Sequence, residues 1–401
     1  MTENEVLRRT WADISLDAVE YNFRQIRAAA GPAKVMAVVK ADAYGHGDRM
    51  MAPFLESIGA DWFGVSNLEE ALGIRESGVT KPILIFGSTP PECAYELAKW
   101  DITQACYSLE YAKELSDAAV KLGATLNVHL KFDTGMGRIG FVVTDDCFDT
   151  ALAESKEAVS LPGIRVTGTF THFSVADEAS EESIAYTKMQ FDRFTRICAA
   201  MKAAGIDPGI RHCCNSAGLL CYPEMRLDMV RPGIILYGLY PADNEFVTSK
   251  IKLSPVMEMR TVVTMVKSLA AGSTVSYGRR YTAPEDEIIA STAVGYADGY
   301  HRLLTNRGRM IVRGQYAKVT GSVCMDQTML EVTGIPGVKE GDRVTVFGRD
   351  GDAFISADEV AALAGTINYE VVCAMSRRVP RCYYYQGENI HNFDYLRWKE
   401  K

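Results

Sequence analysis

The chain has 401 residues, of which 47% are hydrophobic and 23% are charged, and its formal net charge at pH 7 is −8. This length favours two domains over one. The acidic balance, with a pI of about 5.4, argues against a nucleic-acid-binding surface. The sequence has no apolar run of about 18 residues or more, and its start, MTENEVLRRTWADISL, lacks the apolar core of a secretion signal. We therefore expect a cytoplasmic protein that does not act at a membrane.

Ten cysteines are scattered along the chain, without a C-x-x-C pair or a His/Cys cluster that has the spacing of metal ligands. This usage is typical of reduced thiols buried in a cytosolic protein, and we expect no bound metal. Only Cys324, in the segment SVCMDQ, has neighbours that suggest a site.

Between residue 33 and about residue 240, short apolar runs alternate with segments whose apolar residues recur every three or four positions. The expected strands are 34–39, 62–66, 83–87, 103–108, 127–132, 166–173, 210–216 and 226–230. Each is followed by a helix or a short helical turn, which favours a (β/α)8 barrel of the TIM type. An open, doubly wound sheet is the alternative, but no G-x-G-x-x-G motif follows the first strand.

The pattern changes beyond about residue 245. Segments such as DRVTVFG are rich in strand-forming residues and are joined by turns that contain glycine, so we expect a mainly β domain with one helix near ADEVAALAG. The expected fold class is α/β, a TIM-like barrel followed by this mainly β domain. We place the barrel at 11–245, the β-rich domain at 246–385 and a polar, aromatic tail at 386–401. Residues 1–10 are expected to join the β-rich domain.

Polar residues of reactive types follow the predicted barrel strands, and catalytic residues of such barrels lie at these strand ends. They are Lys40, Lys131, Asp133, Arg138, His172, Asn215, Ser216 and Arg231. Pro232 and Gly233 after the last strand, together with Ser216, suit a phosphate, because they free backbone N–H groups at a helix start. An anion site across the barrel from a lysine suggests pyridoxal phosphate bound as a Schiff base to Lys40.

Each of these residues also has an ordinary structural explanation. A lysine at a strand exit is usually a solvated charge, and a single histidine such as His172 is usually a core or rim residue. Arg231 before a proline can be a structural ion-pair partner, and Asn215 before a helix is a common N-cap. Their combination at the ends of alternating barrel strands favours a cofactor site.

Seven motifs occur in the order found in one enzyme family. They are AVVKADAYGHG, LKFDTGMGRIG, THF, VRPGIILYG, VSYG, VGYADGY and VCMDQ. Over essentially its whole length, the chain resembles the bacterial alanine racemases, which are pyridoxal-phosphate enzymes of the racemase/decarboxylase barrel type. The resemblance implies a homodimer with composite active sites that interconverts L-alanine and D-alanine, a peptidoglycan precursor.

The resemblance implies two catalytic bases that act on the external aldimine of the substrate with pyridoxal phosphate. Lys40, the Schiff-base lysine, would face the D-substrate, and Tyr277 from the partner subunit would face L-alanine. Arg231 would bond the pyridine nitrogen and His172 would lie against the ring. The other implied cofactor contacts are Tyr44, Arg138, Asn215, Ser216, Gly233, Ile234 and Tyr369.

The resemblance also implies that Arg138 and the backbone N–H of Met325 bind the substrate. The implied supporting residues are Lys131, His212, Tyr296, Cys324 and Asp326. Lys131 occupies the position that is carbamylated in many members of the family. The segment VCMDQ also has a purely structural interpretation, as a strand and turn with Asp326 as a cap.

Two positions depart from the family pattern. Ser322 stands where an arginine is common, and His301 replaces a frequent proline, which leaves the electrostatics of the entrance and the carbamylation of Lys131 open. A pocket narrowed by Tyr277 and Tyr369 favours a methyl side chain, yet serine is only one oxygen larger. A serine or broad-specificity racemase, a decarboxylase of the same fold and a non-catalytic cofactor carrier are the alternatives. The β-rich domain argues against the carrier.

Overall fold

The structure is a computed structural model that describes residues 9–397. The chain divides into two compact units. Within the described residues, the barrel unit comprises Val19–Ala43 and Asp48–Ser254, and the β-rich unit comprises 9–18, Tyr44–Gly47 and 255–397. The prediction that residues 1–10 join the β-rich domain falls largely outside the described residues. Within 9–397, no helix is both long enough and apolar enough to cross a membrane.

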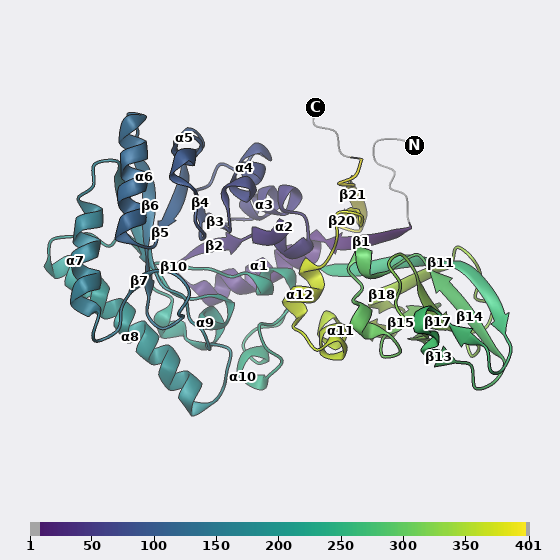
Figure 1. Ribbon diagram of the computed structural model, residues 1–401. Helices are drawn as coiled ribbons and strands as arrows, with labels where there is room; N and C mark the ends of the chain where they lie inside the picture. Colours follow the sequence, from purple (N-terminus) through teal and green to yellow (C-terminus); the bar gives the residue numbers. More distant parts are fainter. Residues whose placement is uncertain (1–8, 398–401) are drawn as a thin grey trace. The chain divides into compact units, whose positions relative to one another are not determined.

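Eight parallel strands form the barrel that the sequence predicts (Figure 1). They are β2 (Lys34–Val38), β3 (Trp62–Val65), β4 (Ile83–Ile85), β5 (Ile102–Cys106), β6 (Leu126–Asp133), β8 (Ile164–Phe170), β9 (Ile210–His212) and β10 (Met229–Val230). They follow one another around the sheet, and β10 pairs with β2. Backbone hydrogen bonds from Asp228 to Arg211 and from Arg231 to Cys214 join the last two strands. The barrel is thus confirmed and the open-sheet alternative is wrong.

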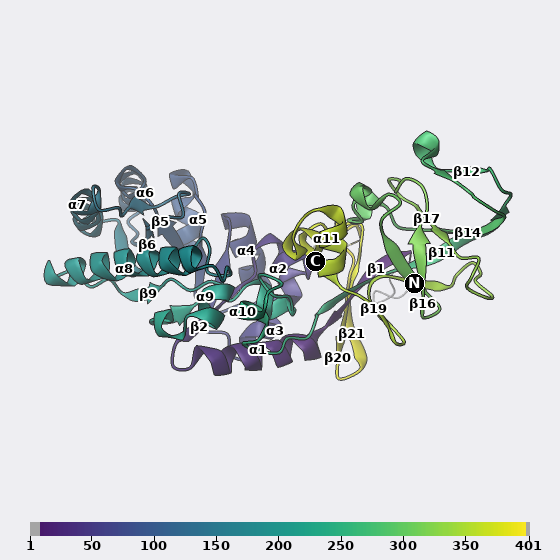
Figure 2. The same ribbon diagram turned by 90° about the horizontal axis from the view of Figure 1, so that it is seen from below.

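Helices follow the strands and lie outside the barrel (Figures 1 and 2). They are α1 (Leu16–Ala30), α2 (Lys40–Gly45), α3 (Asp48–Ser57), α4 (Leu68–Glu76), α5 (Ala94–Lys99), α6 (Leu109–Lys121), α7 (Phe148–Val159), α8 (Glu181–Ala203), α9 (Ser216–Cys221) and α10 (Glu245–Thr248), with the 3-10 turns η1 (Pro91–Cys93), η2 (Pro223–Met225) and η3 (Ile234–Tyr237) and the short strand β7 (Phe141–Val142). Side-chain oxygens of Asn67, Ser108 and Ser180 cap α4, α6 and α8 by accepting from backbone N–H groups. Such caps explain where these helices begin.

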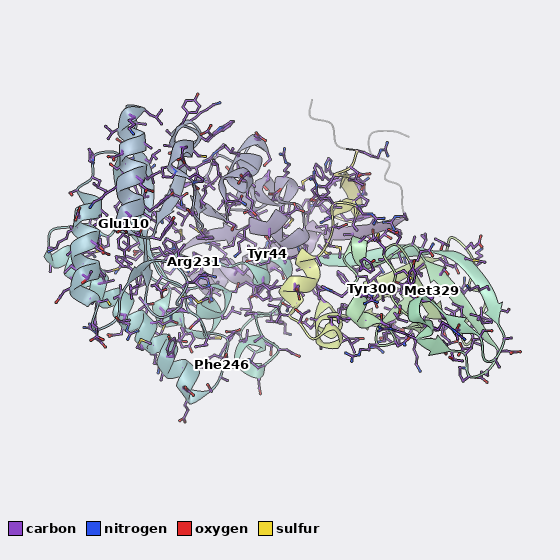
Figure 3. All side chains as sticks on the ribbon, in the orientation of Figure 1. Tyr44, Glu110, Arg231, Phe246, Tyr300 and Met329 are labelled. Atoms are coloured by element: carbon purple, nitrogen blue, oxygen red, sulfur yellow. The ribbon has the colours of Figure 1, made fainter. Side chains whose placement is uncertain are left out.

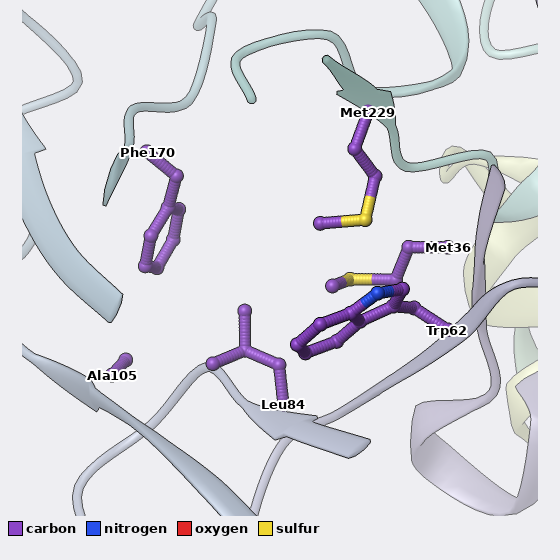
Figure 4. Close-up of a cluster of buried hydrophobic side chains, with 6 residues drawn as sticks. All are labelled: Met36, Trp62, Leu84, Ala105, Phe170 and Met229. Carbon is purple, nitrogen blue, oxygen red and sulfur yellow. The ribbon is translucent and has the colours of Figure 1, made fainter. Parts of the chain in front are cut away.

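The interior of the barrel is filled by side chains. The buried cluster in Figure 4 takes one residue from each of six strands, namely Met36, Trp62, Leu84, Ala105, Phe170 and Met229. Because the barrel strands are buried on both faces, their sequences are continuous apolar stretches and do not alternate between apolar and polar residues. The barrel is therefore a packed core, and chemistry is confined to its ends.

The β-rich unit contains a ten-stranded sheet in the order β19-β18-β15-β16-β17-β14-β11-β1-β20-β21. The strands are β1 (Thr10–Ser15), β11 (Met257–Leu269), β14 (Glu287–Thr292), β15 (Arg309–Val312), β16 (Gln315–Val319), β17 (Thr328–Glu331), β18 (Arg343–Asp350), β19 (Ala353–Ile355), β20 (Arg381–Tyr385) and β21 (Glu388–Phe393). Because β18 also pairs with β11, the strands from β18 to β11 form a closed ring. A separate hairpin joins β12 (Thr274–Val275) to β13 (Tyr281–Thr282).

Two expectations for this unit need correction. The sequence predicts one helix near ADEVAALAG, which is α11 (Ala357–Ala364), but a second helix, α12 (Asn368–Cys373), follows it. The segment 386–401 shows no strand pattern in the sequence and is described there only as a polar, aromatic tail, but Glu388–Phe393 forms β21 and pairs antiparallel with β20. The second helix, α12, carries Tyr369, one of the residues that the resemblance implies as a cofactor contact.

Candidate active site

Arg231 lies at the centre of a buried cluster at the carboxyl end of the barrel (Figure 3). Its Nη2 donates to the carbonyl oxygens of Thr171 at 2.7 Å and Cys213 at 3.0 Å. Nη1 lies 2.9 Å from Nδ1 of His212, and Nη2 lies 3.3 Å from Nδ1 of His172. Burial lowers the pKa of Arg231 to about 10, so the guanidinium stays charged at neutral pH.

The hydrogen bonds of this cluster determine where the histidine protons lie. A charged guanidinium can only donate, so Nδ1 of His212 accepts from Arg231. Nε2 of His212 therefore carries the proton of the neutral ring and donates it to Nδ1 of His129 at 2.9 Å. His129 in turn carries its proton on Nε2. Burial, followed by the charge of Arg231, lowers the pKa of His129 to about 3 and that of His212 well below its usual range, so both rings are neutral.

His129 fits into a space that only glycine leaves open. A Cβ atom on Gly168 would lie 2.6 Å from Nε2 of His129, closer than real atoms approach. On another side the ring packs against Trp62, with 5.2 Å between centroids. Nε2 of His129 has no hydrogen-bond partner among the described residues. The ring of His129 is thus held by packing and by one hydrogen bond, to His212.

Phe170 connects the barrel core to this cluster. Its ring stacks on His212 with the centroids 4.9 Å apart and an angle of 2° between the planes. The guanidinium carbon of Arg231 lies 5.6 Å from the centroid of the Phe170 ring, and Nζ of Lys131 lies 5.3 Å from it. A ring face attracts cations, so Phe170 partly offsets the burial of two positive charges.

Lys131 is an unusual buried amine. It lies on β6 with 3% of its surface exposed, and its Nζ has no hydrogen-bond partner within residues 9–397. Burial, with the charges of Arg138 and Arg231, lowers the pKa of Lys131 to about 8. A substantial fraction of the amine is therefore neutral, and thus nucleophilic, near physiological pH.

The loop after β6 is organised by Asp133, and it carries Arg138. The carboxylate of Asp133 accepts from the backbone N–H groups of Gly135, Gly137 and Arg138 at 3.0, 3.0 and 2.9 Å. Burial acts to raise the pKa of Asp133, but these three donors and Lys131 outweigh it, and the pKa is lowered. The ionised carboxylate thus fixes the backbone from which Arg138 extends.

His172 follows β8 and is held through its backbone. Its carbonyl oxygen accepts from Nε2 of Gln190 at 3.1 Å. Burial, followed by the positive charges of Arg231, Arg138, Lys131 and Lys40, lowers the pKa of His172 well below its usual range. His172 is consequently a neutral ring among cations.

Ser216 and Gly233 come together after β9 and β10. Oγ of Ser216 accepts from the backbone N–H of Gly233 at 2.9 Å, and both residues are buried. Asn215 caps α9 by accepting from the N–H of Gly218 at 2.9 Å. Gly233 is itself the cap of η3, which begins at Ile234. These short helix starts are the local geometry that the sequence predicts for an anion site.

Two strands end well before the predicted site residues that follow them, and Pro232 lies outside the helical turn in which it was predicted. β8 ends at Phe170, two residues before His172, and β9 ends at His212, before Asn215 and Ser216. Pro232 precedes the cap of η3 and does not lie in its first turn. For both strands the physical reason is the same, because a side chain that points into the site needs a loop backbone that leaves the hydrogen-bond ladder.

Lys40 stands at the end of β2 and begins a left-handed turn. The next four residues, Ala41, Asp42, Ala43 and Tyr44, have φ values of +54°, +55°, +51° and +55°. The N–H of Ala43 donates to the carbonyl oxygen of Val39 at 2.9 Å, so the turn closes as a helix of the opposite hand. Each non-glycine residue in this conformation costs roughly 1–2 kcal/mol. Consecutive residues of this kind persist only where the surroundings stabilise them.

Glu70 is one source of that stabilisation. Its Oε1 accepts from the N–H of Ala41 and its Oε2 from the N–H of Ser66, both at 2.7 Å. Glu70 lies in the first turn of α4, where its own N–H donates to the capping Asn67 at 2.9 Å. One carboxylate thus joins the start of α4 to the residue after Lys40. Charge-assisted bonds of this kind are about twice as strong as neutral ones.

The β-rich unit holds Tyr44 and Tyr369. Their ring centroids are 6.1 Å apart at an angle of 47°. The next residue, Gly45, approaches α12 so closely that a Cβ atom would lie 2.1 Å from the carbonyl oxygen of Val372. The carbonyl oxygen of Gly45 accepts from Nε of the buried Arg381 at 2.9 Å. Tyr44 is therefore held by the backbone that follows it.

Met325 lies on a loop that pairs with the segment GYAD. The N–H groups of Tyr296 and Ala297 donate to the carbonyl oxygens of Cys324 and Met325 at 3.0 and 3.1 Å. A Cβ atom on Gly295 would lie 2.3 Å from both of these oxygens, so the pairing requires glycine there. This close pairing holds the backbone at Met325, whose side chain is exposed.

Asp326 and Tyr277 complete the predicted residues of this unit. The carboxylate of Asp326 accepts from Nη2 of Arg378 at 2.7 Å, so it acts in an ion pair. Tyr277 begins the short turn η4 (Tyr277–Arg279) between β12 and β13, and 73% of its surface is exposed in the single chain.

The predicted residues fall into two groups. The barrel unit holds Lys40, Lys131, Arg138, His172, His212, Asn215, Ser216, Arg231, Gly233 and Ile234, and the β-rich unit holds Tyr44, Tyr277, Tyr296, Cys324, Met325, Asp326 and Tyr369. Sequence reasoning missed His129, Gly168, Phe170 and Glu70. Only Glu70 had a local signal, since Asn67 followed three positions later by a glutamate is the pattern of a capping box.

Comparisons with known proteins agree with this architecture. The family model "Alanine racemase, N-terminal domain" matches residues 14–241, and "Alanine racemase, C-terminal domain" matches residues 256–383. An alanine racemase of Desulfosudis oleivorans is 46% identical over 93% of this chain and 96% of its own length. One from Clostridium perfringens is 43% identical over 97% of this chain and 99% of its own length.

Solved structures of the same kind also superimpose closely. Alanine racemase from Clostridium difficile matches with a TM-score of 0.91 and 38% identity, covering 98% of this chain and 100% of that one. The Bacillus anthracis alanine racemase with bound L-Ala-P matches with a TM-score of 0.89 and 35% identity, covering 98% and 99%.

A barrel of this kind with a C-terminal β-rich domain, and with relatives of these names, defines an amino-acid racemase, an isomerase. Both domain matches and the near-complete coverage of the relatives then identify the family. The chain belongs to the alanine racemase family.

Proposed function

We propose that Lys40 and Tyr277 are the two bases with which this chain interconverts L-alanine and D-alanine, the reaction of its family. Lys40 would serve the D face of Cα, and Tyr277 of a second subunit would serve the L face. The observation that supports this site most strongly is the buried cluster around Arg231, bound by neutral imidazoles at the carboxyl end of the barrel.

Racemisation requires a proton to leave one face of Cα and another to arrive on the opposite face. One base cannot readily reach both faces, so two are needed. A lysine serves as a base only when it is neutral, and a tyrosine only when positive charge stabilises its phenolate. We propose that the guanidinium of Arg231 supplies this charge through His172, to which it is hydrogen-bonded.

Pyridoxal 5'-phosphate fits the residues of the barrel unit. Oγ of Ser216 accepts a hydrogen bond from the backbone N–H of Gly233. The hydroxyl proton of Ser216 is therefore available to donate a hydrogen bond to an anion. The proposed phosphate contacts are Ser216, Asn215, Gly233 and Ile234, with Tyr44 and Tyr369. Lys40 would hold the cofactor covalently. When bound, the cofactor supplies an electron-withdrawing ring that makes the Cα proton acidic.

Arg231 suits the pyridine nitrogen of that ring in a particular way. A guanidinium donates hydrogen bonds but does not give up its proton at neutral pH, and the pKa of Arg231 stays at about 10 despite burial. The ring nitrogen would therefore stay unprotonated. By leaving that nitrogen without a proton, Arg231 would make the bound cofactor a weaker electron sink than a carboxylic acid partner would, which would favour racemisation over side reactions.

Substrate binding is proposed for Arg138 and for the backbone N–H of Met325 from the partner subunit. Cys324, Asp326 and Tyr296 would support the Met325 loop. Arg138 extends from the loop that Asp133 organises, which supports a fixed position for its guanidinium.

We propose that Lys131 is carbamylated by carbon dioxide. The reaction needs a neutral amine, and burial lowers the pKa of Lys131 to about 8. The amine nitrogen would add to the carbon of carbon dioxide and release one proton to solvent, and the resulting carbamate anion would be hydrogen-bonded by the neighbouring Arg138. Carbon-13 NMR with labelled bicarbonate should show one carbamate signal that Lys131→Met removes.

The proposed assembly is a cytoplasmic homodimer, since Tyr277 and Met325 would act from the partner subunit. The product D-alanine would serve as a peptidoglycan precursor. No nucleic-acid or membrane partner is proposed. The relatives do not favour a serine or broad-specificity racemase.

One experiment tests the proposed function. The purified enzyme should show a visible absorbance band from cofactor bound covalently to a lysine, and Lys40→Ala should lose it. Loss of optical activity should be followed in parallel for L-alanine and L-serine, and alanine should react faster. Absence of the band in the unaltered enzyme would end the cofactor assignment, and equal rates would favour the broad-specificity alternative.

A further inference from the structure

The backbone around Tyr277 sets the direction of its Cα–Cβ bond, and 73% of the surface of this residue is exposed in the single chain. The residue lies in the turn between β12 and β13, in which Ser276, Gly278 and Arg279 all have positive φ values, of +66°, +72° and +48°. A turn of this kind is not held by a regular hydrogen-bond ladder. Whatever fixes this turn therefore fixes the direction in which the Cα–Cβ bond of Tyr277 leaves the backbone.

Ser276, directly before Tyr277, has the least favourable backbone conformation of this turn. Its φ of +66° and ψ of −176° lie in a region that is essentially restricted to glycine. A residue with a Cβ atom stays there only when its neighbours stabilise it. Strain of this kind next to a proposed base suggests that the conformation serves the reaction.

Ser276 and Ser322 stabilise the turn through a reciprocal pair of hydrogen bonds. Oγ of Ser276 donates to the carbonyl oxygen of Ser322 at 2.8 Å, and Oγ of Ser322 donates to the carbonyl oxygen of Tyr277 at 2.8 Å. Ser322 is 1% exposed, so water does not compete for these bonds. Oγ of Ser276 also lies within hydrogen-bond distance of Sγ of Cys324, at 3.2 Å.

The segment that carries Ser322 is itself anchored. The N–H of Gly321 donates to Oδ1 of Asn306 at 2.6 Å, and Nδ2 of Asn306 donates to the carbonyl oxygen of Arg280 at 2.9 Å. A Cβ atom on Gly321 would lie 2.8 Å from the carbonyl oxygen of Val275, so only glycine permits this approach. Ser322 thus reaches the turn from a fixed base, and Asn306 holds the far end of the same turn.

We propose that Ser322 is a positioning residue for Tyr277, acting through the Tyr277 carbonyl and the strained backbone of Ser276. The inference rests on the proposed role of Tyr277 as the base for the L face. In that role the phenolate oxygen takes the proton of Cα from L-alanine, while Lys40 gives a proton to the opposite face. Loss of the Ser322 hydroxyl should slow proton transfer at Tyr277 and leave transfer at Lys40 unaltered.

Deuterium kinetic isotope effects test this assignment, because they report which proton transfer limits the rate. Ser322→Ala should lower kcat for L-alanine at least about tenfold, since a small misplacement of a catalytic group has effects of this order or larger. Its isotope effect with Cα-deuterated L-alanine should rise, and that with Cα-deuterated D-alanine should fall. Ser322→Thr keeps the hydroxyl and should restore both effects. Ser291→Ala, a buried serine on β14, is the matched control and should change neither.

A second readout does not depend on activity. Hydrogen exchange followed by mass spectrometry should show faster exchange in the peptide covering 276–282 in Ser322→Ala, because the amide of Arg279 is bonded within this turn to the carbonyl oxygen of Ser276 at 3.1 Å. The assignment of Ser322 would be overturned if Ser322→Ala changed the isotope effects for L-alanine and D-alanine in the same direction. Hydrogen exchange of the 276–282 peptide that matches the unaltered enzyme would also overturn it. Tyr277→Phe separates the two proposals: if it stays active, the role of Tyr277 itself is wrong, whereas an inactive Tyr277→Phe beside an unaffected Ser322→Ala contradicts only the inference about Ser322.

Discussion

Arg231 donates a hydrogen bond through Nη1 to Nδ1 of His212, with 2.9 Å between the nitrogens. This bond fixes the tautomer of His212 and, through it, that of His129, whose Nδ1 accepts the proton of His212 at 2.9 Å. The chain of donors runs away from Arg231 and ends in the barrel core. Arg231 therefore keeps its protons, and the hydrogen-bonded pair His212 and His129 fixes the orientation of its guanidinium.

Replacing His129 should destabilise the fold through the bond to His212. In His129→Leu, the N–H of His212 loses its acceptor in a buried site, and a buried donor without a partner costs about 1–3 kcal/mol. Denaturant titration should show a loss of this order in the free energy of unfolding. His129→Gln offers an amide oxygen as acceptor and should lose less; if the two variants are equally destabilised, the bond to His212 is not what stabilises this part of the core.

The space for His129 depends on Gly168. A Cβ atom there would lie 2.6 Å from Nε2 of His129, so Gly168→Ala forces the ring to move within a packed core. Overpacking of this kind typically costs about 1–3 kcal/mol. Gly334→Ala is the matched control, because a Cβ atom on Gly334 meets nothing within 4 Å. Thermal unfolding should separate the two variants, and equal melting temperatures would contradict the steric explanation.

Lys131 makes stability depend on pH. Its pKa in the folded chain, lowered to about 8, lies below the ordinary lysine value of 10.5. Between these values the unfolded chain binds more protons, so this contribution to stability rises with pH across that window and is unfavourable below it. In buffer free of bicarbonate, Lys131→Met should be more stable than the unaltered enzyme at pH 7. That advantage should shrink by pH 10, and a difference independent of pH would rule out the lowered pKa.

The left-handed turn after Lys40 gives a test of backbone strain. Ala41 has a φ of +54°, a conformation that glycine adopts without penalty. Ala41→Gly should therefore be neutral or slightly stabilising in denaturant titration. Ala362, exposed in the right-handed helix α11, is the matched control, and Ala362→Gly should cost about 0.5–1 kcal/mol. If Ala41→Gly and Ala362→Gly lower the free energy of unfolding equally, the backbone at Ala41 is not strained.

The barrel could be predicted from sequence because its strands are buried on both faces and separated by helical segments. The charged and polar residues that follow those strands were equally visible, since a long apolar run that ends in a lysine, as VMAVV does before Lys40, is unusual. The family motifs then supplied roles for residues that are distant in sequence. The roles of these residues remain predictions.

Other features had no signal in the sequence. Ala41 and Ala43 are strong formers of right-handed helices, so nothing local indicates their left-handed turn. The bond between His129 and His212 joins residues that are distant in sequence and depends on the curvature of the barrel. The strand Glu388–Phe393 contains mostly polar residues and forms because β20 offers an edge. Tertiary context decided each of these cases.

The central claim is that Lys40 of one subunit and Tyr277 of the other share one active site. Mixing the inactive variants Lys40→Ala and Tyr277→Phe under conditions of subunit exchange tests it most directly. Half of the dimers should then be mixed, and each mixed dimer should contain one site with both bases intact, which restores about a quarter of the original activity. If exchange is verified by mass and no activity returns, the two residues do not act together across subunits.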